Sequence, residues 1–299
     1  MICVECTNPD IKCLYSRFKS KYIKLTVCSK CGNLADKYIE FDNVLVFLDV
    51  LLLKAPAYRH VAYNLVESAI FGHAEDDDGA PDSLKPPSYR PLARYFVLSI
   101  LFEVYLKWAY EERSSQHTLM MGVVLEYADA WQYFYFITSL LVERVTFCGL
   151  LYLMFRHLLN WGLKPNQNLP AHLQRLYYIC VLNVAIFLSL VVKCLPIVML
   201  IWPYDNATIA STVVDVFGVF TTIEALKMIA NSSYISTSII VAVATVALVA
   251  VKQLVMSALV AYIFEDFSCS VLFQNEIQRV LGEFNLLREL FHASLRELY

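Results

Sequence analysis

The length of its apolar stretches limits most strongly what this chain can fold into. Residues 177–202 and 235–264 are almost entirely apolar, and a helix needs about 20 such residues to cross a bilayer. Overall, 58% of the residues are hydrophobic and 17% are charged, whereas a soluble domain carries about 25% charged residues. This surplus of apolar side chains predicts a multi-pass α-helical membrane protein.

Four membrane spans are predicted from the apolar stretches. They are Leu92–Tyr110, Tyr133–Phe155, Tyr177–Trp202 and Ile235–Phe264. Residues 207–230 are an uncertain fifth span, because Asp215, Glu224 and Lys227 make insertion costly. The transmembrane region thus covers residues 92–264. Residues 265–299 are expected to form an amphipathic helix on the membrane or against the body of the protein.

Loop charges predict the orientation of these spans. The loop after the second span carries Arg, Lys and His but no acid, so it should lie in the cytosol, whereas the mainly acidic loop after the first span suits the lumen. No secretory signal is visible before Cys3. We therefore expect a cytosolic N-terminus. Two glycosylation sequons, at Asn206 and Asn231, would face the lumen if residues 207–230 do not cross.

Two further segments precede the first span. The run Val44–Leu53 is apolar apart from Asp49 but is too short to cross a bilayer. Residues 44–72 are therefore predicted to form amphipathic helices in the cytosolic interface, with a re-entrant hairpin as the alternative. Residues 73–91 are rich in proline and acidic residues, which predicts a disordered linker.

Closely spaced cysteines mark the N-terminus. Five of the nine cysteines lie in the first 31 residues, and four of them form two C-x2-C pairs, Cys3/Cys6 and Cys28/Cys31. In a reducing cytosol such a cluster indicates a metal site rather than disulfides. Four thiolates in two close pairs are a typical ligand set for structural zinc. The pattern leaves Cys13 as a spare thiol.

The residues around these pairs predict a small fold. Gly32 permits the tight turn that follows a cysteine knuckle. Between the pairs, Tyr22–Val27 alternates in character and is β-branched enough to form a strand. Residues 1–43 are therefore predicted to form a zinc-ribbon-like β domain around one structural Zn²⁺.

A basic and aromatic segment begins at Lys54. Tyr58, Arg59 and His60, with Asn64 one turn further on, are candidate residues for binding a lipid or a protein partner. A phosphate or a sterol hydroxyl is the kind of group that they could bind. The alternative is an anchor that holds an amphipathic segment on the bilayer.

Ionisable residues occur inside the predicted spans. Glu103 and Lys107 can pair within one helix, and Glu143 lies next to Arg144. Lys252 could extend toward the membrane surface. These charges are expected to be helix-packing pairs, and a polar path for a lipid headgroup is the alternative.

The order and spacing of these motifs resemble the Arv family (ACAT-related, required for viability). The match rests on the two cysteine pairs, the run Asp36–Asp42 and the run Ala57–His60, and it covers residues 1–64 most closely. The length suggests a fungal member. The resemblance implies zinc binding by the four cysteines and residence in the endoplasmic reticulum membrane, with the Golgi as a second candidate. It also implies a part in sterol trafficking, sphingolipid balance and glycosylphosphatidylinositol-anchor assembly.

The sequence favours a non-enzymatic role. A closed four-thiolate site leaves no position for substrate, and no G-x-S-x-G or H-E-x-x-H motif is present. The expected partners are membrane lipids (sterol, sphingolipid or glycolipid) and subunits of a lipid-glycosylating complex. A net charge of −3 gives no reason to expect nucleic acid. The alternatives are a transporter or scramblase for sterol or glycolipid, and a lipid-modifying enzyme.

Overall fold

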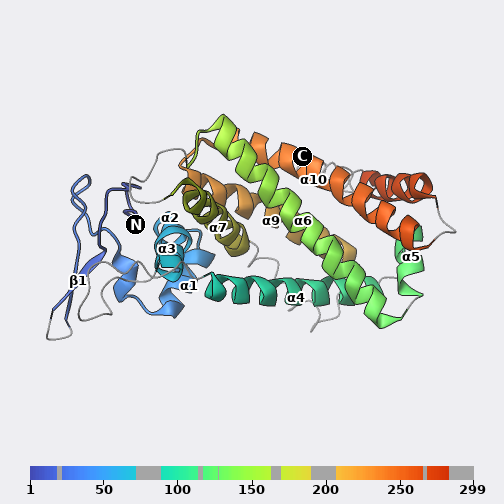
Figure 1. Cartoon of the computed structure of the whole chain (residues 1–299), viewed down its shortest axis with the longest axis horizontal. Helices are drawn as coiled ribbons and strands as arrows, with labels where there is room; N and C mark the ends of the chain where they lie inside the picture. The colour runs from blue at the N-terminus through green and yellow to red at the C-terminus, as the bar shows by residue number, and fades with distance from the viewer. Residues whose placement is uncertain are drawn as a thin grey trace, which may run out of the picture. The chain divides into compact units, whose positions relative to one another are not determined.

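The computed structural model describes residues 1–18, 22–71, 89–113, 117–126, 128–162, 170–189, 207–264 and 268–282. These residues are mostly helical, with a two-stranded sheet near the N-terminus (Figure 1). The chain divides into two units. Unit 1 is Met1–Arg94 with Leu151–Val241, and unit 2 is Tyr95–Leu150 with Ala242–Tyr299. The predicted fold class, a helical membrane protein with a small N-terminal β domain, is confirmed.

The β-hairpin lies between the two cysteine pairs in sequence. Strand β1 (Tyr15–Arg17) pairs antiparallel with β2 (Ile23–Leu25), with Tyr15 opposite Leu25. This places β2 inside the predicted strand. The domain has a very small core of buried residues: Cys3, Ile11, Leu14, Cys28 and Ala35. Because so few apolar side chains are buried, this domain needs support from a metal or from neighbouring elements.

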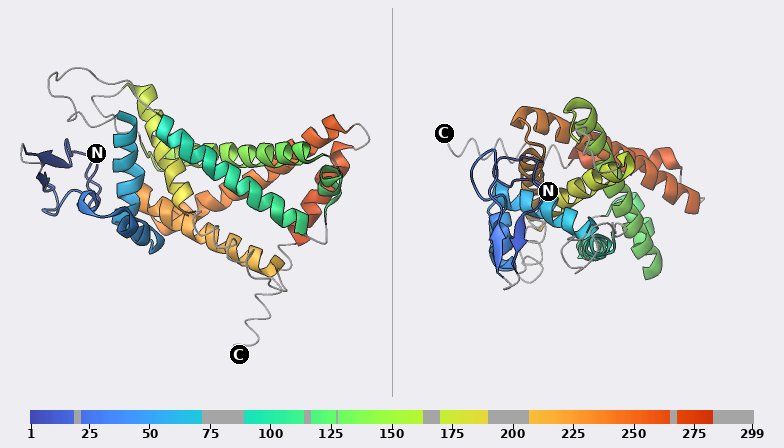
Figure 2. Two further views of the ribbon diagram at one scale, coloured as in Figure 1. Left: turned by 90° about the horizontal axis from the view of Figure 1, so that it is seen from below. Right: turned by 60° about the vertical axis from the view of Figure 1, so that its left-hand side comes forward.

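A run of short helices follows the hairpin. The 3₁₀ turn η1 (Lys37–Glu40) leads into α1 (Asn43–Leu51). After Leu53, which has a left-handed backbone with φ of 54°, come α2 (Ala55–Arg59), the π-helical turn η2 (His60–Leu65) and α3 (Val66–Phe71) without a break. Figure 2 (left) shows this continuous α2–η2–α3 rod between the N-terminal domain and α7 (Ala171–Ser189).

Helices α7 and α9 (Ala207–Ala230) pack antiparallel in unit 1. At one end, the Ser189 hydroxyl lies 3.0 Å from that of Thr222. One to two turns earlier in α7, Val181 and Ala185 are buried in one cluster with Ile229 of α9 and with Ala62 and Val66 of the rod. The rod therefore packs on the C-terminal half of α9 and on α7.

Among the described residues, three helices are long and apolar enough to cross a membrane: α6 (Asp129–Leu158), α7 and α10 (Tyr234–Ile263). Helix α4 (Arg90–Arg113) covers the first predicted span, and α9 covers the uncertain fifth. Both have 24 residues, but neither is among the three. Part of the third predicted span, residues 190–202, lies outside the described residues. The number of spans remains a prediction.

Unit 2 contains parts of α4, α6 and α10 around a core that includes Ile100, Leu140 and Met256. A short helix, α5 (Leu119–Leu125), adds Met120, Met121 and Val124 to this core. The sequence instead predicts a loop for these residues. The predicted C-terminal helix is described over residues 269–282, where Leu272 is fully buried in the same core. The predicted linker lies mostly outside the described residues.

Candidate metal centre

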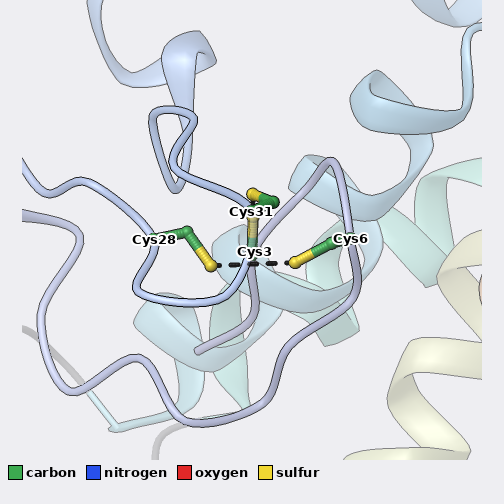
Figure 3. Close-up of side chains that lie close together, drawn as sticks. All are labelled: Cys3, Cys6, Cys28 and Cys31. Atoms are coloured by element: carbon green, nitrogen blue, oxygen red, sulfur yellow. Dashed lines mark hydrogen bonds between the residues drawn. The ribbon is translucent and has the colours of Figure 1, made fainter.

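The thiols of Cys3, Cys6, Cys28 and Cys31 converge from the two knuckles (Figure 3). The sulfur atoms of Cys3 and Cys31 are 3.8 Å apart, those of Cys6 and Cys28 are 3.7 Å apart, and all four lie within 4.8 Å of one another. A tetrahedral ion with metal–sulfur bonds of about 2.3 Å holds its ligand atoms about 3.8 Å apart. The four predicted ligands therefore form a group that could bind a metal ion.

The backbone forms the same turn after each cysteine pair. Gly32 follows the second pair with a φ of 72°, and its amide donates to the Cys28 carbonyl at 2.9 Å. Thr7 follows the first pair with a φ of 59°, and its amide donates to the Cys3 carbonyl at 2.9 Å. The sequence indicated this turn at Gly32. It did not indicate it at Thr7, because a β-branched residue rarely adopts a left-handed backbone.

The four thiols have different environments. Cys3 and Cys28 are buried, whereas Cys6 and Cys31 are half-buried. Hydrogen bonds from the backbone amides of Cys31 and Lys30 lower the pKa of Cys28 to about 6. Burial raises the pKa of Cys3 to about 12. A bound cation would favour the thiolate form of every ligand. Cys13 is exposed and lies outside the group.

Arg59 connects the first knuckle to the end of α9. Its guanidinium donates to the carbonyls of Val4 at 3.0 Å and Glu5 at 2.9 Å, and also to the carbonyl of Met228 at 3.1 Å. The last four carbonyls of a helix lack partners within the helix, and a positive charge is favourable there. Burial lowers the pKa of Arg59, but an arginine remains charged in proteins. Arg59 therefore joins the cysteine domain to α9.

Asn64 binds the backbone of the segment that leads into the first knuckle. Its side-chain oxygen accepts from the Ile2 amide at 2.9 Å, and its side-chain nitrogen donates to the Ile2 carbonyl at 3.1 Å. The same nitrogen donates to the fully buried carboxylate of Asp36 at 2.7 Å. Asp36 also accepts from the Tyr38 amide and lies 2.6 Å from Nδ1 of His60. These hydrogen bonds offset the free-energy cost of burying the Asp36 carboxylate.

Two further residues extend the same face of the rod. The Tyr63 hydroxyl donates to the Ile229 carbonyl at 2.9 Å, one residue beyond the carbonyl that Arg59 binds. The N-terminal amino group donates to Glu67 at 2.7 Å. Neither Tyr63 nor Glu67 is among the predicted site residues. Tyr63 and Glu67 follow Arg59 by four and eight residues, a spacing that places side chains on one face of a helix. This spacing is the signal by which the sequence could have indicated them.

The four residues predicted to bind a lipid or partner all lie on or beside this network. Tyr58, His60 and Asn64 are buried, and Arg59 is half-buried. Tyr58 packs in a cluster with Tyr38, Val50 and Met228. The polar groups of the other three bind protein atoms. Lipid or partner binding at these residues therefore stays a prediction, while their observed contacts hold the cysteine domain in place.

The fold and the cysteine group together define a helical membrane protein whose N-terminal domain has four cysteines that could bind a metal ion. A model of the Arv1-like family matches residues 2–226, and the chain belongs to this family. It is 34% identical to Protein ARV1 of Candida albicans over 95% of this chain and 97% of that protein. It is 28% identical to Protein ARV1 of Saccharomyces cerevisiae (78% and 83% covered) and 27% identical to human Protein ARV1 (77% and 72% covered). No solved structure matches this chain. The predicted resemblance to a fungal Arv protein is confirmed.

Proposed function

We propose that this protein is a non-enzymatic membrane factor of the endoplasmic reticulum that supports lipid distribution, with one structural Zn²⁺ in its N-terminal domain. Four thiolates occupy every position of a tetrahedral ion, so no position remains for a substrate. The observation that carries the proposal is the connection through Arg59. The backbone of the first knuckle and the end of α9 bind the same guanidinium. The metal thus stabilises a domain that is joined to a hydrophobic helix.

Family membership supports the finer roles. The Arv resemblance implies sterol trafficking, sphingolipid balance and glycosylphosphatidylinositol-anchor assembly. Membrane lipids and subunits of a lipid-glycosylating complex are the partners that fit these roles. Zinc suits the site because it binds thiolates strongly in a tetrahedral geometry and has no redox chemistry of its own.

The exposed side of α1 supports a position in the membrane interface. The large apolar side chains on this side of α1, together with Leu52 just after it, are between 44 and 68% exposed: Val44, Leu45, Phe47, Leu48, Leu51 and Leu52. Asp49, the one acid in this helix, accepts from Tyr38 at 2.9 Å and Lys54 at 2.6 Å. The hydrogen bond from Lys54 lowers the pKa of Asp49. A helix of nine residues is about 14 Å long, too short for a hydrocarbon core of about 30 Å. We infer that α1 lies shallowly in the bilayer.

With the cytosolic N-terminus that the loop charges predict, the contacts of α9 fit a five-span topology. Arg59 and Tyr63 bind the C-terminal carbonyls of α9, so that end lies on the side of the cysteine domain. Helix α7 runs antiparallel to α9. If α7 runs from the cytosol to the lumen, α9 runs from the lumen back to the cytosol. Asn206, immediately before α9, then belongs in the lumen, and Asn231, immediately after it, belongs in the cytosol.

Substitution of a single cysteine tests the structural role of the metal. Cys28→Ser should release the metal and unfold the N-terminal domain, because structural zinc supplies about 10–16 kcal/mol of apparent binding free energy. Cys13→Ser is the matched control, since Cys13 is exposed and outside the group. The control should restore growth of cells that lack the native protein, and Cys28→Ser should not. Equal rescue by both variants would contradict the proposal.

Reconstitution of the purified full-length protein separates the proposed role from the alternatives. A non-enzymatic factor should leave lipid substrates unchanged in liposomes. Turnover of a lipid that is lost on changing one acidic or histidine residue would refute it. A second candidate function is lipid transport, which the ion pairs between α4, α6 and α10 favour: Lys107 and Lys252 with Glu143, and Glu103 with Arg144. Transbilayer movement of lipid by the protein without partners would support that candidate instead.

A further inference from the structure

The exposed side of α1 carries no charged residue. The helix contains one acid, Asp49, and no lysine or arginine. The Asp49 carboxylate accepts hydrogen bonds from the hydroxyl of the buried Tyr38 and from Lys54, so its charge is directed toward the protein and paired there. Large apolar side chains make up the exposed side, which we call the apolar face: Val44, Leu45, Phe47, Leu48 and Leu51.

Packing against α9 sets the depth of α1. Val50, on the inner side of α1, is buried in a cluster with Tyr58 of α2 and with Ala225 and Met228 of α9. These two α9 residues lie five and two residues before the end of that helix at Ala230, which is at most about 8 Å along its axis. Interfacial helices lie about 5–10 Å into the boundary between headgroups and acyl chains. In the proposed topology the end of α9 meets the cytosolic surface, so α1 lies at this boundary.

The charges beside the apolar face do not attract anionic lipids. Glu40 and Asp42, just before α1, are exposed acids. Lys54, the first lysine after the helix, forms an ion pair with Asp49 at 2.6 Å. Many interfacial helices combine apolar area with lysine and arginine, which bind anionic headgroups. Since α1 has only the apolar area, its contact with the bilayer depends on gaps between headgroups that leave acyl chains accessible.

We propose that α1 senses lipid packing. The apolar face contacts acyl chains where the cytosolic leaflet is loosely packed, and it loses this contact where sterol and saturated chains pack the leaflet tightly. Because Val50 ties α1 to α9, the cost of exposing the apolar face to water makes the whole protein favour loosely packed bilayers. This inference rests on the proposed function and deepens it by naming the property of the lipid surface that α1 recognises.

The test follows a fluorescent amino acid at Leu48 of the full-length protein, with an emission that shifts to the blue in hydrocarbon. Three kinds of vesicle are compared: unsaturated phosphatidylcholine, saturated phosphatidylcholine with cholesterol, and unsaturated phosphatidylcholine with phosphatidylglycerol. The emission should be blue in the first and third and red in the second. The control is the same amino acid at Val145, which is 71% exposed on the spanning helix α6. It should stay blue in all three, because its contact with acyl chains does not depend on packing.

Two variants at Leu51 test the role of charge. Leu51→Lys places a cation on the apolar face, so phosphatidylglycerol should raise the ratio of blue to red label by about fivefold, the usual effect of one lysine near an anionic surface. Leu51→Gln removes apolar area without adding charge, and phosphatidylglycerol should leave its ratio unchanged. The pair separates an effect of charge from an effect of lost apolar area.

Four outcomes would overturn the inference. Equally blue emission at Leu48 in loosely and tightly packed vesicles would refute packing recognition alone, and the interfacial position of α1 would stand. Red emission in every vesicle would refute both. Blue emission only with phosphatidylglycerol would identify headgroup charge as the attraction. Loss of the blue emission on diluting the protein within the vesicles would identify a second copy of this chain as the occupant of the apolar face.

Discussion

Replacing Arg59 with alanine should loosen the N-terminal domain without emptying its metal site. The guanidinium makes part-buried hydrogen bonds to Val4 and Met228 and an exposed one to Glu5. A hydrogen bond contributes about 0.5–1.5 kcal/mol net, and more with a charged donor. Two part-buried bonds and one weaker bond amount to about 3 kcal/mol. If the whole loss falls on the metal-bound state, metal affinity drops roughly 100-fold.

Chelator competition on the full-length protein in detergent measures this effect. Structural zinc binds with about 10–16 kcal/mol, so Arg59→Ala should still purify with one equivalent of zinc. A chelator should remove that zinc at roughly 100-fold lower concentration than from the native protein. The loss should also weaken the attachment of the domain to α9, which hydrogen exchange at the Val4 and Glu5 amides would report.

Lys37→Ala is the matched control for Arg59→Ala. Lys37 binds the same Glu5 through its side chain at 3.1 Å, but the pair is exposed. Exposed ion pairs contribute about 0–1 kcal/mol, so this variant should bind zinc almost as the native protein does. If the same chelator concentration removes zinc from both variants, Arg59 does not stabilise the metal site.

Three further predictions test other parts of the account. Gly32→Ala should destabilise the metal-loaded protein by about 1–2 kcal/mol through its left-handed backbone alone, since no atom lies within 4 Å of the added methyl group; an unchanged thermal midpoint would contradict this. Glycosidase treatment should shift the mobility of the protein through Asn206 and not through Asn231, and a shift abolished by Asn231→Gln would argue against a returning α9. A fluorescent side chain placed at Leu48, which is 46% exposed, should be quenched by brominated lipids, whereas one placed at Tyr22 should not. Equal quenching at the two positions would contradict the proposed position of α1 in the bilayer interface.

The sequence predicted those features that depend on near neighbours. Two C-x2-C pairs identify the four cysteines that come together because each knuckle is a local turn, and α10 follows the apolar stretch 235–264 closely. Contacts between distant segments were not predictable in the same way. The partners of Arg59 are separated from it by 54, 55 and 169 positions. A basic residue beside a membrane suggests a headgroup, and only the tertiary structure provides the carbonyls that it binds.

The ion pairs of unit 2 show the same limitation. Pairing of Glu103 with Lys107 within one turn is the natural local expectation. The packing of α4 against α6 offers Glu103 an arginine and Lys107 a different glutamate. The π-helical turn η2 is similar, because nothing in its composition distinguishes it from an α-helix. In this turn, the side chains of both His60 and Asn64 contact the Asp36 carboxylate of the N-terminal domain.

The central claim is that four thiolates of the N-terminal domain bind one zinc ion. X-ray absorption at the zinc edge, on the full-length protein purified without added metal, measures this directly. We expect one zinc per chain with four sulfur ligands at about 2.3 Å, and loss of this signal in Cys28→Ser but not in Cys13→Ser. A zinc shell with nitrogen or oxygen ligands, or a protein without stoichiometric metal, would contradict it.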